Sequence, residues 1–245
     1  MRRFGRTLVR GVGQALLTLG LVVLLFVVYE VWVSDGINQV KQSQLTQDLR
    51  QRWESGTDPL TAPARPDGGP AQLPLGAGFA FIRIPAFGLD YDRVILEGTD
   101  PSKLTEGPGH YPGTAFPGEL GNFSMAGHRV GKGSPFLNLD LLRPGDAIII
   151  ETGQNWYVYR MLGVSDAAAD PDGLVGREIV DPSAVQVVDP VPDRPGQIPT
   201  RRLLTLTTCN PKFSAAQRLV IHAEMDGPPL PKAQYPDGPP ALSEG

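Results

Sequence analysis

Arg202-Leu-Leu-Thr-Leu-Thr-Thr-Cys209, followed directly by Asn210-Pro211, is the segment that decides the fold of this chain. Aliphatic and β-branched side chains favour strands, and an Asn-Pro pair is typical of a turn. The segment therefore predicts a β-strand that breaks into a loop at Cys209. A side chain at such a boundary is mounted rigidly and faces any groove beside it.

Seven similar segments flank this one and are separated by turns rich in glycine and proline. Short strands spaced in this way are typical of an all-β barrel or sandwich, and eight of them can close a small barrel. We therefore expect an all-β, closed eight-stranded β-barrel with short helical turns at 101–105 and 135–142, each opened by proline. The predicted strands are residues 79–84, 91–96, 122–127, 147–152, 155–164, 185–188, 202–209 and 218–225.

The chain of 245 residues is long enough for one domain of ordinary size with flanking segments. Residues 79–226 contain all the predicted strands and form the expected folded domain. Residues 34–78 predict a polar stalk, with a short helix standing off a membrane, and then a Pro/Gly-rich linker that cannot bury a core. Residues 227–245 are again rich in proline and predict a disordered tail.

The N-terminus predicts the compartment. Arg2, Arg3, Arg6 and Arg10 precede the almost wholly apolar stretch 11–33, which is long enough to cross a bilayer, since a spanning helix needs about 20 residues. Arginine before the span places residues 1–10 in the cytoplasm and the rest outside the cell. A cleaved signal peptide is the rival interpretation, but the stretch is longer than an ordinary signal core and no small-x-small cleavage site follows it. We expect a single-pass membrane anchor in contact with lipid.

The charge pattern excludes one large class of partner. The net charge of -4 comes from interspersed acidic and basic residues, without a basic run beyond the N-terminus, which argues against nucleic-acid binding. The sequence contains no glycine-rich phosphate loop and no paired-cysteine metal motif. We therefore expect neither a metal nor a cofactor.

Cys209 is the single cysteine of the chain. It cannot form an internal disulfide, and exported proteins rarely keep a lone thiol without a reason. A buried, inert cysteine is the alternative, but the predicted strand end favours an exposed thiol. Cys209 is thus a candidate nucleophile, which needs a partner for proton transfer and a donor for an oxyanion.

Three histidines could serve Cys209. His128 follows the predicted strand 122–127, where small neighbours leave room around its imidazole. His222 lies within a predicted strand, which favours a structural role, and His110 lies in a turn-rich loop that is a poor rigid mount. His128 is therefore the preferred partner.

Arg218 opens the last predicted strand, nine residues after Cys209, so the chain returns alongside the strand that carries the cysteine. A guanidinium is always charged and offers several donors, which suits an oxyanion or a substrate carbonyl. A surface arginine at a strand start is the alternative.

Three of these segments, in this order and spacing, resemble the signature of the sortase family: Ser124-Met-Ala-Gly-His-Arg129, Thr205-Leu-Thr-Thr-Cys-Asn-Pro211 and Arg218-Leu-Val220. The resemblance extends from about residue 79 to residue 225. Within the family, Tyr111-Pro-Gly-Thr114 and Cys209-Asn-Pro211 are similar to elements of the actinobacterial class E enzymes.

The resemblance implies a sortase-like barrel and a cysteine transpeptidase. It implies that Cys209 attacks the threonine carbonyl of a Leu-Pro-x-Thr-Gly or Leu-Ala-x-Thr-Gly sorting signal and forms a thioester. His128 then protonates the leaving amine, and Arg218 holds the oxyanion. Tyr111, Thr207 and Thr208 are the expected substrate-binding residues, the last through its backbone.

The implied partners are exported proteins with C-terminal sorting signals and a peptidoglycan precursor whose amine resolves the thioester. Three alternatives stay open from the sequence. The enzyme could polymerise pilins, it could be a surface cysteine peptidase that uses water, or the barrel could bind peptides without catalysis.

Overall fold

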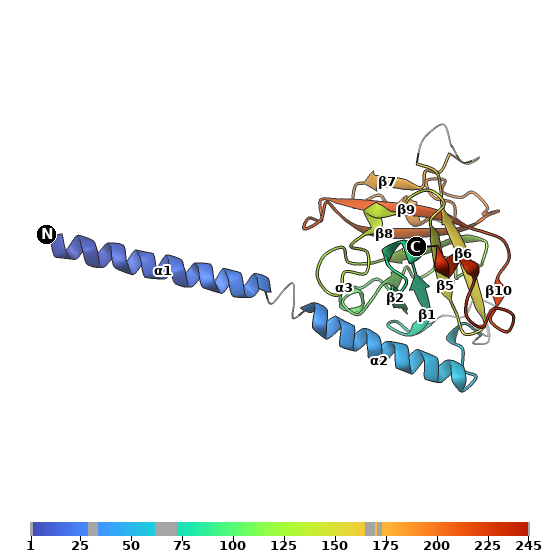
Figure 1. Cartoon of the computed structure of the whole chain (residues 1–245). Helices are drawn as coiled ribbons and strands as arrows, with labels where there is room; N and C mark the ends of the chain where they lie inside the picture. The colour runs from blue at the N-terminus through green and yellow to red at the C-terminus, as the bar shows by residue number, and fades with distance from the viewer. Residues whose placement is uncertain (1, 29–33, 62–72, 165–169, 171–172, 245) are drawn as a thin grey trace.

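The computed structural model describes residues 2–28, 34–61, 73–164, 170 and 173–244. The chain forms two N-terminal helices, α1 (Arg2–Val28) and α2 (Ser34–Glu54), followed by a β-barrel (Figure 1). The short helix α3 (Pro101–Leu104) confirms one predicted helical turn, and the second is a 3-10 turn reduced to Leu139–Leu141.

Eight strands close the barrel, as predicted. They follow the order β6-β5-β1-β2-β3-β4-β8-β9, and a further pairing of β6 with β9 completes the ring. Two shorter strands extend the sheet, β7 (Arg177–Val180) beside β9 and β10 (Leu230–Pro231) beside β6. The barrel strands are β1 (Gly78–Arg83), β2 (Asp92–Glu97), β3 (Gly109–His110), β4 (Gly121–Ala126), β5 (Ala147–Glu151), β6 (Asn155–Met161), β8 (Arg202–Asn210) and β9 (Gln217–Met225).

The predicted strand at 185–188 is wrong, and the eighth strand of the barrel is β3, which the sequence analysis does not predict. Val185–Val188 forms a 3-10 helix in which Val187 is buried and Val185 is 72% exposed. This segment lies between prolines, which cannot donate to a strand ladder. The missing barrel strand is β3, which is two residues long and shows no periodic pattern.

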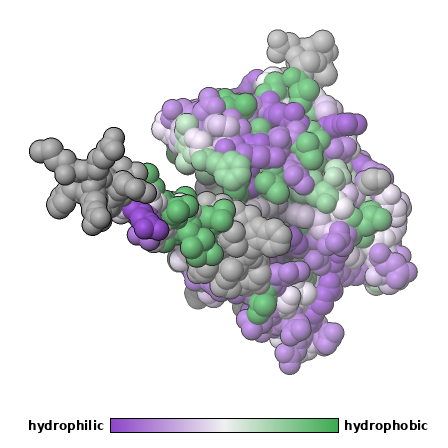
Figure 2. Space-filling view, turned by 60° about the vertical axis from the view of Figure 1, so that its left-hand side comes forward, coloured by the Kyte–Doolittle hydropathy of each residue, from purple (hydrophilic) through white to green (hydrophobic). Residues whose placement is uncertain are grey.

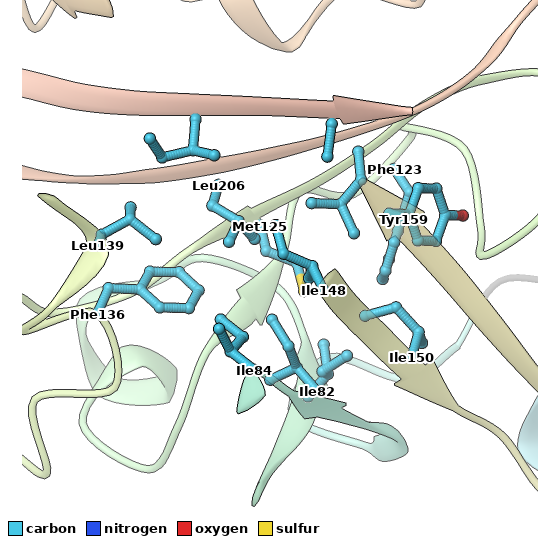
Figure 3. Close-up of a cluster of buried hydrophobic side chains, with 14 of the residues drawn as sticks. Ile82, Ile84, Phe123, Met125, Phe136, Leu139, Ile148, Ile150, Tyr159 and Leu206 are labelled. Atoms are coloured by element: carbon cyan, nitrogen blue, oxygen red, sulfur yellow. The ribbon is translucent and has the colours of Figure 1, made fainter. Parts of the chain in front are cut away.

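The barrel interior is filled by side chains from every second position of the long strands. On β8, Leu204 and Leu206 point inward and meet the core residues of β9. Figure 3 shows Leu206 beside Met125 of the neighbouring strand β4, and Phe123 of the same strand beside Tyr159. Full burial of one such side chain contributes about 1.5–3 kcal/mol. Because inward and outward positions alternate, this core also determines which side chains of β8 face outward.

The expected stalk is partly wrong. Residues 34–54 do form a helix, but α2 packs against the barrel instead of standing off it. Leu49 is 1% exposed, Trp53 stacks edge-on with Phe81 at 5.4 Å between ring centroids, and the side chain of Gln42 accepts a hydrogen bond from the Val94 amide. Residues 62–72 of the predicted Pro/Gly-rich linker lie outside the described residues.

The expected disordered tail is also wrong. Residues 227–244 run over the outside of β5 and β6 and end in a 3-10 helix, Pro240–Ser243, in which Ala241 is buried. Trp156 donates its indole N–H to the Tyr235 carbonyl at 3.0 Å, and Lys232 donates to the buried Glu151 at 2.7 Å. The prolines occupy turns and a sheet edge, where a missing N–H costs nothing.

Within the residues that the structure describes, no helix is both long and apolar enough to span a membrane. Helix α1 extends away from the barrel (Figure 1), and hydrophobic side chains gather on the part of it that comes forward in Figure 2.

Candidate active site

Cys209 lies near the end of β8 on the outer face of the barrel. Because Leu204 and Leu206 fill the interior, Thr205, Thr207 and Cys209 face outward. The thiol is free and partly exposed. The strand therefore places the sulfur at the surface on a rigid mount, as the sequence predicts.

Arg218 lies directly opposite Cys209 in the antiparallel pair of β8 and β9. Residues in this relation have Cβ atoms about 4.5–5.5 Å apart. The guanidinium donates from Nη1 to the carbonyl of Ala215, in the turn that joins the two strands, and to that of Gln217 at the start of β9, each at 3.0 Å. The charged group thus stays at the same end of the barrel as the thiol.

His128 reaches the same end through the parallel pair of β4 and β8. The register ends at Ala126 and Thr207, and two further residues along each chain lead to His128 and Cys209. Two hydrogen bonds continue the register: the Gly127 amide donates to the Thr207 carbonyl at 3.1 Å, and the Thr208 hydroxyl donates to the Gly127 carbonyl at 2.7 Å.

The environment of His128 favours its neutral form. Burial lowers the pKa of the imidazole below its ordinary value, and the nearby Lys132 ammonium lowers it further. Its Nε2 atom is buried, without a hydrogen-bond partner in the described part of the chain. A neutral imidazole with an unengaged nitrogen is suited to exchange protons with a ligand or a thiol.

The other two histidines have structural roles. His110 is fully buried, with Nδ1 at 2.6 Å from Glu97 and Nε2 at 2.9 Å from the Thr114 hydroxyl. His222 is equally buried, between the Thr205 hydroxyl at 2.8 Å and Glu178 at 3.0 Å. Both ring nitrogens of each residue are engaged.

Tyr111 and Thr207 meet on the face that carries Cys209. The Tyr111 hydroxyl lies 2.9 Å from the Thr207 hydroxyl. A hollow of about 770 Å³ opens between the β3–β4 loop and the segment before β8. Its lining includes Pro112, the residue after Tyr111, together with Leu120, Pro190 and Ile198.

Thr208 has a different environment. Its side chain is 2% exposed, points into the barrel and is committed to the Gly127 carbonyl. The hydroxyl therefore positions the segment before His128, and only the Thr208 backbone remains for the predicted role in substrate binding.

The sequence analysis missed the roles of two residues at this end of the barrel, Arg129 and Asn210. Arg129 donates from Nη1 to the Asn210 side-chain carbonyl at 2.6 Å and to the Cys209 carbonyl at 3.3 Å. The position of Arg129 directly after His128 was the available signal, but the contact depends on the parallel register of β4 and β8. Among the described residues, no cluster of His, Cys, Asp and Glu is arranged to hold a metal ion.

Residues 82–226 match the family model of the sortase domain. The chain belongs to the sortase family. It is 32% identical over 223 residues to the Sortase SrtE1 of Streptomyces coelicolor, a match that covers 88% of this chain and 56% of that relative. This sortase therefore spans just over half the length of that relative.

Solved sortase structures share the fold. The SrtF sortase from Corynebacterium diphtheriae superposes with a TM-score of 0.64 at 38% identity, over 71% of this chain and 96% of that chain. Sortase E1 from Streptomyces coelicolor, solved with a tripeptide in its active site, gives a TM-score of 0.56 at 35% identity, over 68% and 97%. These matches confirm the predicted sortase barrel and the resemblance to class E. Sortases are transpeptidases.

Proposed function

We propose that this sortase uses Cys209 to cleave a Leu-Pro-x-Thr-Gly or Leu-Ala-x-Thr-Gly sorting signal between threonine and glycine. The observation that carries the proposal is the cross-strand pairing of Cys209 with Arg218, with His128 brought to the same strand end by the register of β4 and β8. Nucleophile, charged donor and proton-transfer group thus come from three separate segments to one end of the barrel.

The proposed reaction has two acyl transfers. The neutral His128 imidazole takes the proton of the Cys209 thiol, the resulting thiolate attacks the threonine carbonyl carbon, and the Arg218 guanidinium stabilises the oxyanion. His128 gives a proton to the leaving glycine nitrogen as the C–N bond breaks, which leaves a thioester on the sulfur. An incoming amine then attacks the thioester, His128 takes its proton, and the C–S bond breaks to release the new amide.

For this reaction, Arg218 has to exchange its present acceptors for the substrate. Its guanidinium is bound to two backbone carbonyls that are accessible to water. Such bonds contribute little net free energy because water replaces them. A developing oxyanion is the stronger acceptor, since both partners are then charged.

We assign recognition of the sorting signal to Tyr111, Thr207 and the hollow whose lining includes Pro112, the residue after Tyr111. The hollow lies within the usual range of about 300–1,000 Å³ for ligand sites, and its lining combines proline and aliphatic side chains. A tripeptide occupies the active site of the related Sortase E1, which supports a peptide in the corresponding place here.

We further propose that residues 11–33 anchor the protein in the membrane, with residues 1–10 in the cytoplasm and the barrel outside. The support is the arginine-rich start and the apolar sequence, together with exposed aliphatic side chains on α1. The acceptor is then an amine of a peptidoglycan precursor. A lysine of a pilin subunit is the alternative acceptor, and water would make the protein a peptidase.

The test of catalysis uses the full-length protein in detergent with a labelled Leu-Ala-x-Thr-Gly peptide and an amine acceptor. We expect a ligated product and a thioester at Cys209 detectable by mass spectrometry, both abolished in Cys209→Ala. Hydrolysis without ligation at saturating amine would refute the transferase assignment. Binding of the peptide without ligation or hydrolysis would favour the non-catalytic barrel.

The test of topology uses the thiol itself, because the chain has a single cysteine. A membrane-impermeant maleimide should label Cys209 in intact cells expressing the full chain, with Cys209→Ala as the control. Labelling that requires cell lysis would refute the proposed orientation.

A further inference from the structure

Arg129 is a buried arginine next to the proposed active site. It follows His128 in the chain, and only 5% of the residue is exposed. Burial of a guanidinium is costly unless its donors are paired. Its partners therefore show what the residue holds together.

One end of the guanidinium contacts the segment that carries the thiol. Arg129 Nη1 donates to the side-chain carbonyl of Asn210 at 2.6 Å and to the main-chain carbonyl of Cys209 at 3.3 Å. The Asn210 amide in turn donates to the Gln217 side chain at 3.2 Å. Gln217 precedes Arg218, so a single chain of contacts runs past all three proposed catalytic residues.

The other end of the guanidinium is fixed by charge. Arg129 Nη2 lies 3.2 Å from the Asp140 carboxylate, which also lies 3.6 Å from Lys212. Asp140 belongs to the 3-10 helix Leu139–Leu141, which is supported from below by the buried Leu139. The arginine therefore bridges a packed element and the strand end.

The backbone pairing of β4 and β8 does not extend as far as His128 and Cys209. The parallel pairing of β4 and β8 ends at Ala126 and Thr207, two residues before His128 and Cys209. The contact of Arg129 with Cys209 and Asn210 continues the connection beyond the ladder. Small errors in the separation of reacting groups are expensive, since a displacement of about 1 Å can reduce a rate about 100-fold.

We propose that Arg129 is a positioning residue that holds His128 and Cys209 in register for acyl transfer. This inference rests on the proposed function of the same site. It predicts an effect on the chemical step in folded protein, whereas a merely structural arginine would affect only the amount of folded protein.

The experiment compares Arg129→Met and Arg129→Lys with Arg201→Met in the full-length protein. Arg201 is a matched control, because it is a partly buried, ion-paired arginine at the opposite end of β8, bound to Asp170 and Glu224. Steady-state ligation gives kcat and KM for the sorting peptide, and thermal unfolding gives Tm for each variant.

We expect Arg129→Met to lower kcat about 10- to 100-fold with KM changed less than about threefold, while Arg201→Met keeps kcat within about threefold of wild type. Arg129→Lys should recover part of the loss, because lysine retains a cationic donor at this position. The proposal is overturned if Arg129→Met matches Arg201→Met in kcat per folded molecule. No recovery in Arg129→Lys would overturn it as well.

Two further measurements keep the test decisive. If Arg129→Met does not fold, Asn210→Ala removes the 2.6 Å contact from the other side, and we expect kcat to fall about 10-fold. The alkylation rate of Cys209 by iodoacetamide needs no sorting peptide. If wild type does not ligate, the proposed function fails, but a several-fold change in this rate in Arg129→Met and not in Arg201→Met would still support positioning. Equal rates would refute it.

Discussion

Thr208→Val is the sharpest test of how the barrel supports His128. The Thr208 side chain is 2% exposed, and its hydroxyl donates to the Gly127 carbonyl at 2.7 Å. Valine keeps the shape of the side chain but leaves that buried oxygen without this donor. An unsatisfied buried polar group costs about 1–3 kcal/mol.

The expected loss of unfolding free energy can be measured as a decrease in the melting temperature, Tm. For a protein of this size, 1 kcal/mol corresponds to about 2–4 °C, so Thr208→Val should lower Tm by roughly 2–12 °C. Urea unfolding followed by tryptophan fluorescence should show the same loss as a lower midpoint with an unchanged slope.

A matched control separates the effect of losing a buried hydrogen bond from the general effect of replacing threonine with valine. The Thr105 hydroxyl donates to the Ser102 carbonyl at 2.6 Å, but this pair is accessible to water. Thr105→Val should therefore change stability by less than about 0.5 kcal/mol. Equal midpoints for Thr208→Val and wild type would refute the argument that this buried hydroxyl supports the segment before His128.

Four other perturbations test the environment of His128, the core and the C-terminal segment. Lys132→Gln should raise the pKa of His128 toward its ordinary value, read as an upward shift of the imidazole titration midpoint by NMR. The pKa of His128 is lower in the folded than in the unfolded state, so folding favours the neutral imidazole. The free energy of unfolding should therefore fall as pH drops below about 6.5 and level off below the folded pKa. His128→Gln should remove this part of the pH dependence in urea titrations. Leu206→Ala, at a fully buried position, should cost about 2–5 kcal/mol by the same titration. Deletion of residues 228–245 should uncover Trp156 and lower Tm, with increased acrylamide quenching of tryptophan fluorescence.

The sequence predicts the long strands and the thiol well, because these depend on local patterns. β8 and β9 lie within a residue of their expected bounds. The placement of Cys209 at a strand end follows from Asn210-Pro211 alone. By contrast, β3 pairs through only two residues, and its position is set by neighbouring strands instead of by its own side chains.

The remaining errors concern contacts between distant segments. The composition of the C-terminal residues indicates disorder, yet Lys232 lies 4.3 Å from the ring centre of Trp53 and 5.1 Å from that of Trp156. Cation–π contacts of this kind have no local signature in sequence. The contacts of Arg129 escaped prediction for the same reason, since they join residues about 80 positions apart.

If residues 11–33 form the proposed membrane anchor, the packing of α2 on β1 and β2 limits how far the barrel can move from the membrane. Helix α2 and the barrel are already in contact. The length of the Pro/Gly-rich segment that connects them therefore does not determine the distance between them. Added Gly-Ser residues within 62–72 should leave the reach of Cys209 unchanged, whereas residues added between α1 and α2 should extend it. In the proposed topology, a substrate must therefore come close to the membrane to reach Cys209.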